Sequence, residues 1–385
     1  MEGLVHPDFG LVTEKLDKVM RGRRAFGGAA VAVYHRGELV VDAWTGERDA
    51  TGTPWQRDTM AMSFSTTKGV VATVVHRLVD RGELSYDEPV ATYWPEFAAA
   101  GKEHITLRHL LTHQAGMHDV RSLVPGAETL LDWDDMVQRL AAATPRWQPG
   151  TRPGYHGLTY GWLVGEVIRR VTGLSVNDAV QREIAQPLGT DGLFIGSPPE
   201  QRVRTADLLL EEKDAARMEG LFGRLERFDR FQPLLDALVV DDFLDIALTD
   251  RILDAEVPAA NGVFTARSLA HMYAALATPQ YFDHPPLVSP ETMAQATTIQ
   301  TSERDAVVGF KLRWRLGYHL AGTTSGIVPT GFGHFGFGGS GAWADPQSEL
   351  AVAMVLNRVT GTPFGDTRFM RVGGAAVRAA KRRGR

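Results

Sequence analysis

The chain has 385 residues, of which 44% are hydrophobic and 23% are charged, with a formal net charge of -5. These proportions are those of a globular protein with material for a large core, and they give no basic surface for nucleic acid or anionic membranes. We therefore expect a small-molecule partner. The absence of cysteine excludes disulfides, thiolate catalysis and cysteine-based metal sites.

The length allows roughly two or three average domains, or one large composite domain. The first residues, MEGLVHPDFG, include acidic side chains and no apolar run of signal-peptide length, and no later apolar stretch is long enough to cross a membrane. From this we expect a cytoplasmic protein without a membrane span. The oligomeric state does not follow from the sequence.

The N-terminal part is predicted to form a helix followed by a β-hairpin. An amphipathic pattern runs from Leu11 to Arg21. The next segment, Ala29 to Gly46, has two β-rich runs on either side of His35-Arg36-Gly37-Glu38, an arrangement typical of a hairpin.

A serine and a lysine three residues apart, Ser65-Thr66-Thr67-Lys68, begin the next predicted helix, Thr66 to Arg81. Apolar residues follow at helical spacing: Val70, Val71, Val74, Val75 and Leu78. Because residues three apart on a helix are neighbours, the Ser65 hydroxyl can reach the Lys68 amine.

Such a pair can act as nucleophile and base in acyl transfer. Burial lowers the pKa of a lysine enough for it to activate a serine, and the helix N-terminus favours negative charge near Ser65. The motif also has a structural reading, because Ser-x-x-Lys occurs by chance and serine is a common helix N-cap.

The middle of the chain, from residue 89 to 277, is predicted to be mostly helical. The segments with helical periodicity are Leu107 to Thr112, Trp133 to Ala142, Thr159 to Val171, Val176 to Ile184, Leu221 to Ile252 and Ala266 to Leu276. Leu221 to Ile252 mixes large apolar and acidic residues, so it is either a mobile lid over a cleft or a surface helical pair.

Within this part, Tyr155 lies in a stretch rich in turn-forming residues, Pro149 to Gly157. On such a loop its phenol can share a proton with Lys68 and deliver it to a leaving group, provided that both side chains face one cleft. A packing role for the tyrosine is the alternative.

The C-terminal part is predicted to return to β-structure. Three strands, Gly309 to Leu320, Gly333 to Ala344 and Glu349 to Asn357, precede a basic helical tail that starts at Asp366. We expect the two ends of the chain to share one sheet. The predicted fold is therefore α/β, with an antiparallel sheet flanked by helices and an inserted, mostly helical domain.

The expected domain boundaries follow from this pattern. Residues 1–88 and 278–385 form the α/β domain, residues 89–277 form the helical domain, and the active site lies at their interface.

Five glycines between Gly333 and Gly341 (GHFGFGGSG) would weaken an ordinary strand. They suggest a close approach of the backbone to a ligand or to another segment. An edge strand of this kind can direct a backbone N–H at a substrate carbonyl, whose oxygen becomes charged in the transition state. The alternative is a glycine-rich bulge or a tight hairpin.

Two histidines four apart on a predicted helix, His109 and His113, have a spacing that can bind zinc. No glutamate of the His-Glu-x-x-His type and no third ligand accompany them, so we interpret them as packing and capping residues. We expect no metal and no cofactor.

Together these motifs resemble the serine β-lactamase and penicillin-binding-protein superfamily, and in particular the carboxylesterases built on the class C β-lactamase fold. The resemblance extends from about Ala29 to Asn357. It includes Ser-x-x-Lys, Tyr155 after a Pro-Gly turn, and two further segments, Ile105 to Met117 and Pro258 to Tyr273.

The resemblance implies roles for individual residues. Ser65 would be the acylated nucleophile, Lys68 and Tyr155 the proton-transfer pair, and the backbone N–H groups of Ser65 and Phe337 the oxyanion hole. His334 would occupy the place of the lysine in the family's Lys-Thr-Gly motif. We expect His334, Gly336 and Gly338 to contact the substrate.

Two departures from the family pattern affect the expected substrate. The usual Tyr-x-Asn triplet is Tyr155-His156-Gly157 here, which removes an amide and leaves Tyr160 as the fallback for the tyrosine role. His334 lacks the permanent charge with which a lysine would bind a carboxylate. Both departures favour an uncharged ester over a penicillin.

The sequence therefore predicts a serine carboxylesterase that cleaves short-chain carboxylic esters through an acyl-enzyme on Ser65, with a small-molecule ester as its partner. An acyltransferase and an amide, β-lactam or D-amino peptide hydrolase are the alternatives. A non-catalytic binding protein on the same fold is a further alternative from a different class.

Overall fold

The computed structural model describes residues 1–21, 27–360 and 366–383. Within them, strands from both ends of the chain form one antiparallel seven-stranded sheet, in the order β1-β3-β2-β10-β9-β8-β7. The strands are β1 (Glu2–Val5), β2 (Gly28–His35), β3 (Glu38–Gly46), β7 (His319–Thr323), β8 (Gly326–Phe335), β9 (Gly341–Asp345) and β10 (Leu350–Leu356). The expected shared sheet is confirmed.

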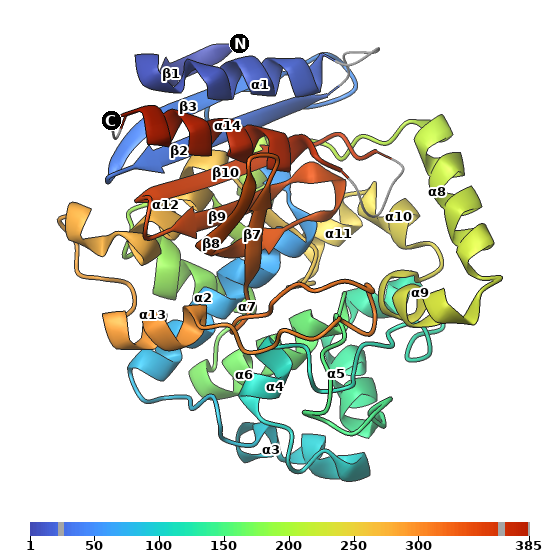
Figure 1. Ribbon diagram of the computed structural model, residues 1–385. Helices are drawn as coiled ribbons and strands as arrows, with labels where there is room; N and C mark the ends of the chain where they lie inside the picture. The colour runs from blue at the N-terminus through green and yellow to red at the C-terminus, as the bar shows by residue number, and fades with distance from the viewer. Residues whose placement is uncertain (22–26, 361–365, 384–385) are drawn as a thin grey trace.

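Helices cover both faces of this sheet (Figure 1). Alternate residues of β2 point to opposite faces. Val31 and Val33 pack with α1 (Gly10–Met20) and α14 (Arg368–Arg383), whereas Ala30 and Ala32 belong to the larger core on the other face. That core includes residues of α12 (Ala266–Ala277) and α2 (Thr67–Asp80).

The N-terminal hairpin forms as predicted. Its turn lies at Arg36 and Gly37, whose φ angles are 55° and 72°. Two consecutive residues with positive φ give the type of turn whose twist matches that of a two-stranded ribbon.

A mostly helical region lies beside the sheet and contains a small sheet, β4-β6-β5, made of β4 (Ala61–Met62), β6 (Gly262–Phe264) and β5 (Leu193–Ile195). Its helices are α3 (Val90–Tyr93), α4 (Leu107–Leu111), α5 (Trp133–Ala142), α6 (Thr159–Thr172), α7 (Val176–Val180), α8 (Glu212–Leu225), α9 (Gln232–Leu238), α10 (Phe243–Ala247) and α11 (Arg251–Asp254), followed by α13 (Pro290–Thr297). The proposed domain boundaries stay a prediction.

Two of the predicted C-terminal strands are wrong in extent. Residues 309–318 are irregular, because Gly309, Arg313 and Gly317 have φ angles of 78°, 50° and 74°, which interrupt an extended chain. The segment Gly333 to Ala344 is divided between β8 and β9 by a 3-10 turn, Phe337–Gly339.

The segment Leu221 to Ile252 is neither one long helix nor a simple helical pair. It contains the end of α8, then α9 and α10, and the start of α11. Asp242, with a φ of 62°, directly precedes α10 and interrupts the helical pattern. Figure 1 shows α8 along one side of the molecule, with α9 at its end.

Candidate active site

Ser65 lies in a tight 3-10 turn, Phe64–Thr66, immediately before α2. Phe64 has a φ of 44°, a strained value for an aromatic residue. The Thr67 hydroxyl stabilises the turn, because it donates to the carbonyl oxygen of Phe64 and accepts the backbone N–H of Gly262 at 2.9 Å. Ser65 therefore lies at the N-terminal end of a buried helix, one residue before the predicted helix start.

Lys68 is fully buried beside Ser65. Its Nζ atom is 3.1 Å from Ser65 Oγ and donates to the carbonyl oxygens of Gly157, at 2.7 Å, and Ala259, at 3.0 Å. Burial holds the pKa of Lys68 well below its ordinary value, because desolvation disfavours the charged ammonium.

Tyr155 approaches Ser65 from the loop before α6, as predicted. Its hydroxyl donates to Ser65 Oγ at 2.7 Å, and its ring lies parallel to that of Trp314, with centroids 5.6 Å apart. Burial raises the pKa of Tyr155 above its ordinary value, so the phenol stays protonated at neutral pH. The side chain thus packs in a core and also contacts the serine.

Tyr160, the fallback for the tyrosine role, lies near Lys68, but its hydroxyl lies beside Gly317, and the tyrosine hydroxyl that contacts Ser65 is that of Tyr155. It is buried in α6, and a Cβ atom added at Gly317 would be 3.0 Å from its hydroxyl. Its ring lies near Lys68, with Nζ 5.8 Å from the ring centroid.

The glycine-rich segment packs directly against the turn that contains Ser65. A Cβ atom at Gly336 would lie 2.3 Å from the carbonyl oxygen of Ser63, so only glycine allows this approach. The Ser340 hydroxyl strengthens the contact by donating to the same oxygen at 2.9 Å.

The expectation of an edge strand is wrong, because β8 lies between β9 and β7. The first residue of β7, His319, pairs with Gly333, so the last residues of β8, His334 and Phe335, extend beyond β7 and line the same cavity as Ser65. Phe337 and Gly338 follow in the 3-10 turn and line the same cavity as Ser65. The oxyanion role of the Ser65 and Phe337 amides stays a prediction.

His334 is buried at the end of β8, with its ring close to those of His319 and Tyr155. Its Nδ1 atom is 3.0 Å from the carbonyl oxygen of Phe335, a distance that identifies Nδ1 as the protonated nitrogen. Burial keeps the pKa of His334 well below its ordinary value, so the imidazole is neutral.

His156, at the unspecified middle position of the Tyr-x-Asn pattern, organises the tyrosine loop, a role that the sequence did not reveal. Its Nδ1 lies 2.8 Å from the carbonyl oxygen of Gly154, and its Nε2 accepts the backbone N–H of Met117 at 3.0 Å. Its own backbone N–H donates to His113 Nδ1 at 3.1 Å. Burial lowers the pKa of His156 to about 3.

The two histidines considered for zinc have structural contacts. His109 caps its own helix, because its Nδ1 accepts the backbone N–H of Thr106. His113 is buried among aromatic rings. No group of three or more His, Cys, Asp or Glu side chains with the geometry of a metal site occurs among the described residues.

A second residue missed in the sequence is Asp305, which accepts the backbone N–H of Tyr155 at 3.1 Å and the indole N–H of Trp314 at 2.9 Å. It lies in a loop without a recognisable motif, 150 residues from Tyr155. No local sequence signal indicates such a contact.

A cavity of about 1010 Å³ opens in front of Ser65 and Tyr155. Its lining is largely apolar and includes Phe222, Leu244, Phe310, Leu312 and Trp314. Among the described residues that line it there is no lysine or arginine, whereas five are acidic: Glu219, Asp241, Asp242, Asp245 and Asp366. Parts of α8 and α10 form one wall, and a lid movement of this segment stays a prediction.

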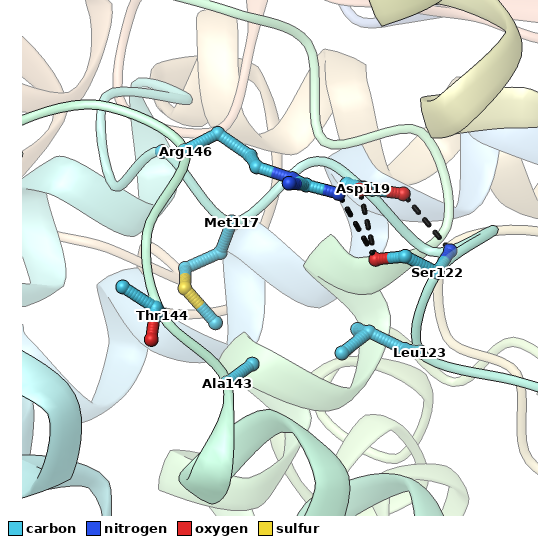
Figure 2. A pocket seen from close by; sticks show the side chains of 8 residues that line it. Met117, Asp119, Ser122, Leu123, Ala143, Thr144 and Arg146 are labelled. Carbon is cyan, nitrogen blue, oxygen red and sulfur yellow. Dashed lines mark hydrogen bonds and ion pairs between the residues drawn. The ribbon is translucent and has the colours of Figure 1, made fainter.

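A smaller hollow of about 230 Å³ lies at the turn after α4, away from Ser65. Figure 2 shows the Arg146 guanidinium directed at Asp119 and Ser122. Asp119 also accepts the backbone N–H and the hydroxyl of Ser122, at 3.0 and 2.8 Å. The charged groups of this hollow are therefore already paired with each other.

Across the described part of the chain, no helix has both the length and the apolar character needed to cross a membrane.

Comparison with known sequences identifies a family and a relative that is similar over most of this chain. A model of the Beta-lactamase family matches residues 16–376. The esterase/beta-lactamase LipL of Mycobacterium tuberculosis (strain ATCC 25618 / H37Rv) is 40% identical over 363 residues, which cover 93% of this chain and 83% of that protein.

Two solved structures are similar over nearly the whole chain. A penicillin-binding protein homologue from Caulobacter crescentus has a TM-score of 0.86 and 34% identity, covering 98% of this chain and 99% of that one. A family VIII carboxylesterase has a TM-score of 0.84 and 35% identity, with coverage of 98% and 99%. These findings confirm the expected fold class and the resemblance on which the residue roles were based.

Proposed function

The chain belongs to the Beta-lactamase family, and from this premise we propose that it is a serine carboxylesterase that acts through an acyl-enzyme on Ser65. The main supporting observation is that Ser65 Oγ lies within hydrogen-bond distance of both Lys68 Nζ, at 3.1 Å, and the Tyr155 hydroxyl, at 2.7 Å. The relatives described as esterases and carboxylesterases support the same reaction.

Lys68 acts as the base. A neutral lysine amine has two N–H donors and one lone pair. Its two donors are used by the carbonyl oxygens of Gly157 and Ala259, which leaves the lone pair for the Ser65 hydroxyl proton. Burial favours this neutral form, because it lowers the pKa of Lys68.

Tyr155 acts as the proton donor to the leaving alcohol. Its hydroxyl donates to Ser65 Oγ. In the proposed step the Ser65 proton passes to the neutral Lys68 Nζ, 3.1 Å away. After Ser65 attacks the ester carbonyl, the tetrahedral oxyanion is bound by the backbone N–H groups of Ser65 and Phe337. Tyr155 then protonates the departing alkoxide and recovers a proton from Lys68, and water releases the acid.

The substrate is an uncharged ester. A carboxylate-bearing substrate needs a cation or a set of donors at the site. The described lining of the cavity has no lysine or arginine, and His334 is neutral, with Nδ1 as its protonated nitrogen. His334, Gly336 and Gly338 line the cavity beside Ser65 and are proposed to contact the ester.

The test is hydrolysis of p-nitrophenyl acetate, butyrate and octanoate by the wild type and by Ser65→Ala. We expect Ser65→Ala to lower kcat by at least about 10⁴-fold. Ser65, Lys68 and Tyr155 act as a unit, so removing the nucleophile abolishes nearly all of the rate acceleration that the unit provides. Ser302→Ala, at an exposed serine, is the matched control and should keep full activity. Equal turnover by Ser65→Ala and the wild type would refute the mechanism.

The acyl-chain series also defines the size of the substrate. The expected substrate has a short acyl chain, whereas a cavity of about 1010 Å³ has room for larger groups. A fall in kcat/KM from acetate to octanoate would support the short-chain expectation. A rise of up to about fourfold per methylene would show that the apolar walls bind the chain.

β-Lactam hydrolysis is the second candidate, because the relative from Mycobacterium tuberculosis is described as an esterase and a β-lactamase. Nitrocefin carries a carboxylate, and the cavity lacks a lining cation in its described part. We therefore expect kcat/KM for nitrocefin to lie well below that for p-nitrophenyl butyrate. Acyl transfer would instead appear as product that depends on an added acceptor alcohol or amine.

A further inference from the structure

Asp305 is a buried carboxylate in contact with the tyrosine loop, and the proposed mechanism gives it no step. Only 1% of its surface is exposed. Its Oδ1 atom accepts the backbone N–H of Tyr155 at 3.1 Å, together with those of Val307, at 2.9 Å, and Val308, at 3.0 Å. Its Oδ2 atom accepts the indole N–H of Trp314 at 2.9 Å.

These contacts fix Tyr155 at two points. The backbone of Tyr155 is bound directly by Asp305, and its ring lies against Trp314, with 5.6 Å between centroids and 11° between planes. A third link joins the two loops, because the backbone N–H of Ala306 donates to the carbonyl oxygen of Pro153 at 2.8 Å. The Tyr155 hydroxyl then reaches Ser65 Oγ at 2.7 Å.

The contacts require a carboxylate rather than an amide. All four partners of Asp305 are N–H donors, and an ionised carboxylate is the side chain that offers acceptors on both oxygens. In asparagine one oxygen is replaced by an NH₂ group. If the remaining oxygen keeps the backbone donors, the NH₂ group faces the indole N–H of Trp314, and two donors oppose each other.

We propose that Asp305 is a positioning residue for the esterase reaction, which holds the Tyr155 hydroxyl in line with Ser65 and the leaving alcohol. The inference rests on the proposed function. Val308, Phe310 and Leu312 lie between Asp305 and Trp314 and line the cavity, so the same carboxylate also fixes one wall of the substrate site.

The leaving group of the ester provides the test. An ethyl ester must be protonated as its alkoxide departs, whereas p-nitrophenolate is stable as an anion and leaves without an acid. General acid catalysis contributes about 10²–10⁴-fold where it is needed. We expect Asp305→Asn to lower kcat/KM for ethyl butyrate about tenfold more than for p-nitrophenyl butyrate.

A second substitution tests whether the effect passes through Trp314. Trp314→Phe removes the indole N–H. In the double variant Asp305→Asn with Trp314→Phe, the new amide NH₂ group therefore no longer faces another N–H donor. We expect the double variant to recover part of the ethyl butyrate activity that Asp305→Asn loses. Tyr155→Phe should show the same leaving-group pattern with a larger loss.

The matched control is Asp345→Asn. Asp345 is also a buried carboxylate, 5% exposed, which accepts the backbone N–H groups of Gln347 and Ser348 in the β9–β10 turn. It does not line the cavity in the described part of the chain. We expect this variant to change the activities on the two esters by the same factor or not at all.

Two results would overturn the inference. One is an equal loss on both esters in Asp305→Asn, which indicates a general effect on folding. The other is a crystal structure of Asp305→Asn in which the Tyr155 hydroxyl still lies within hydrogen-bond distance of Ser65. If the wild type hydrolyses neither ester, the proposed function fails, and that crystal structure decides the positioning role by itself.

Discussion

At the scale of single residues, the site depends on a lysine that is kept neutral. The partners of Lys68 Nζ are one hydroxyl and two carbonyl oxygens. The titratable side chains around it are those of Tyr155, Tyr160, His113, His156 and His334. None of these is acidic, so no carboxylate among them offsets the desolvation that lowers the pKa of Lys68.

This arrangement predicts a pH-dependent stability cost. Between the lowered pKa of Lys68 in the folded protein and its ordinary value of 10.5, the unfolded chain binds one more proton than the folded chain. Stability of the wild type therefore increases with pH across that window. Lys68→Met lacks this titrating group. As the pH rises across the window, the free energy of unfolding of Lys68→Met relative to that of the wild type should therefore fall by up to about 1.4 kcal/mol per pH unit.

The measurement is urea-induced unfolding of both proteins at several pH values from neutral upward, with the difference in unfolding free energy as the readout. Ser65→Ala keeps Lys68 and should follow the wild type at each pH. A difference between Lys68→Met and the wild type that does not change with pH would mean that Lys68 stays charged when folded. The proposed base would then be wrong.

The sequence predicted the part of the site that is local. Ser65 and Lys68 are three residues apart on one helix, so their contact follows from helical geometry. Asp305 and His156 contact groups that are distant in the chain, or that depend on loop conformation, and no periodicity encodes such contacts. The replacement of the family's asparagine by Gly157 was visible in the sequence, but the role of the neighbouring His156 in holding the loop was not.

At the scale of secondary-structure elements, the site depends on the close packing of β8 against the turn before α2. The contact is made through Gly336, Ser340 and the carbonyl oxygen of Ser63. The sequence indicated a close backbone approach through its glycines. It did not reveal the neighbours of the strand, because residues 309–318 have the composition of a strand but are irregular, and β7 begins only at His319.

Gly336→Ala should separate these two elements. The added Cβ would lie 2.3 Å from the carbonyl oxygen of Ser63, a distance at which the backbone must shift. We expect a loss of stability of about 1–3 kcal/mol, which is typical of overpacking, and a fall in kcat/KM because Phe337 moves away from Ser65. Denaturant unfolding and p-nitrophenyl butyrate hydrolysis measure the two effects.

Gly10→Ala is the control for this substitution. A Cβ at Gly10 would meet no atom within 4 Å, and Gly10 begins α1, away from the cavity. Alanine there should leave activity unchanged and stability the same or slightly higher, because it lowers the entropy of the unfolded chain. Wild-type activity in Gly336→Ala would show that the close approach of β8 is not needed for catalysis.

At the scale of the whole molecule, the two ends of the chain meet in one sheet and one helical layer. β2 and β10 pair at the centre of the sheet, and α1 packs against α14 (Figure 1). Ser65 belongs to the opposite side of the sheet, where Phe64 joins the larger core. The layer formed by α1 and α14 should therefore affect the stability of the fold more than the chemistry of the site.

Leu16→Ala tests this separation. Leu16 is fully buried in α1, in the cluster that contains Val352, Phe369 and Val372. Removing a buried leucine side chain typically costs about 2–5 kcal/mol. We expect that loss in denaturant unfolding, with kcat/KM unchanged well below the unfolding temperature, because no residue of α1 lines the cavity in the described part of the chain.

The half-buried Leu11 in the same helix gives the control Leu11→Ala, whose stability loss should be smaller. A fall in kcat/KM that parallels the loss of stability would instead mean that the helical layer and the active site are coupled through the sheet.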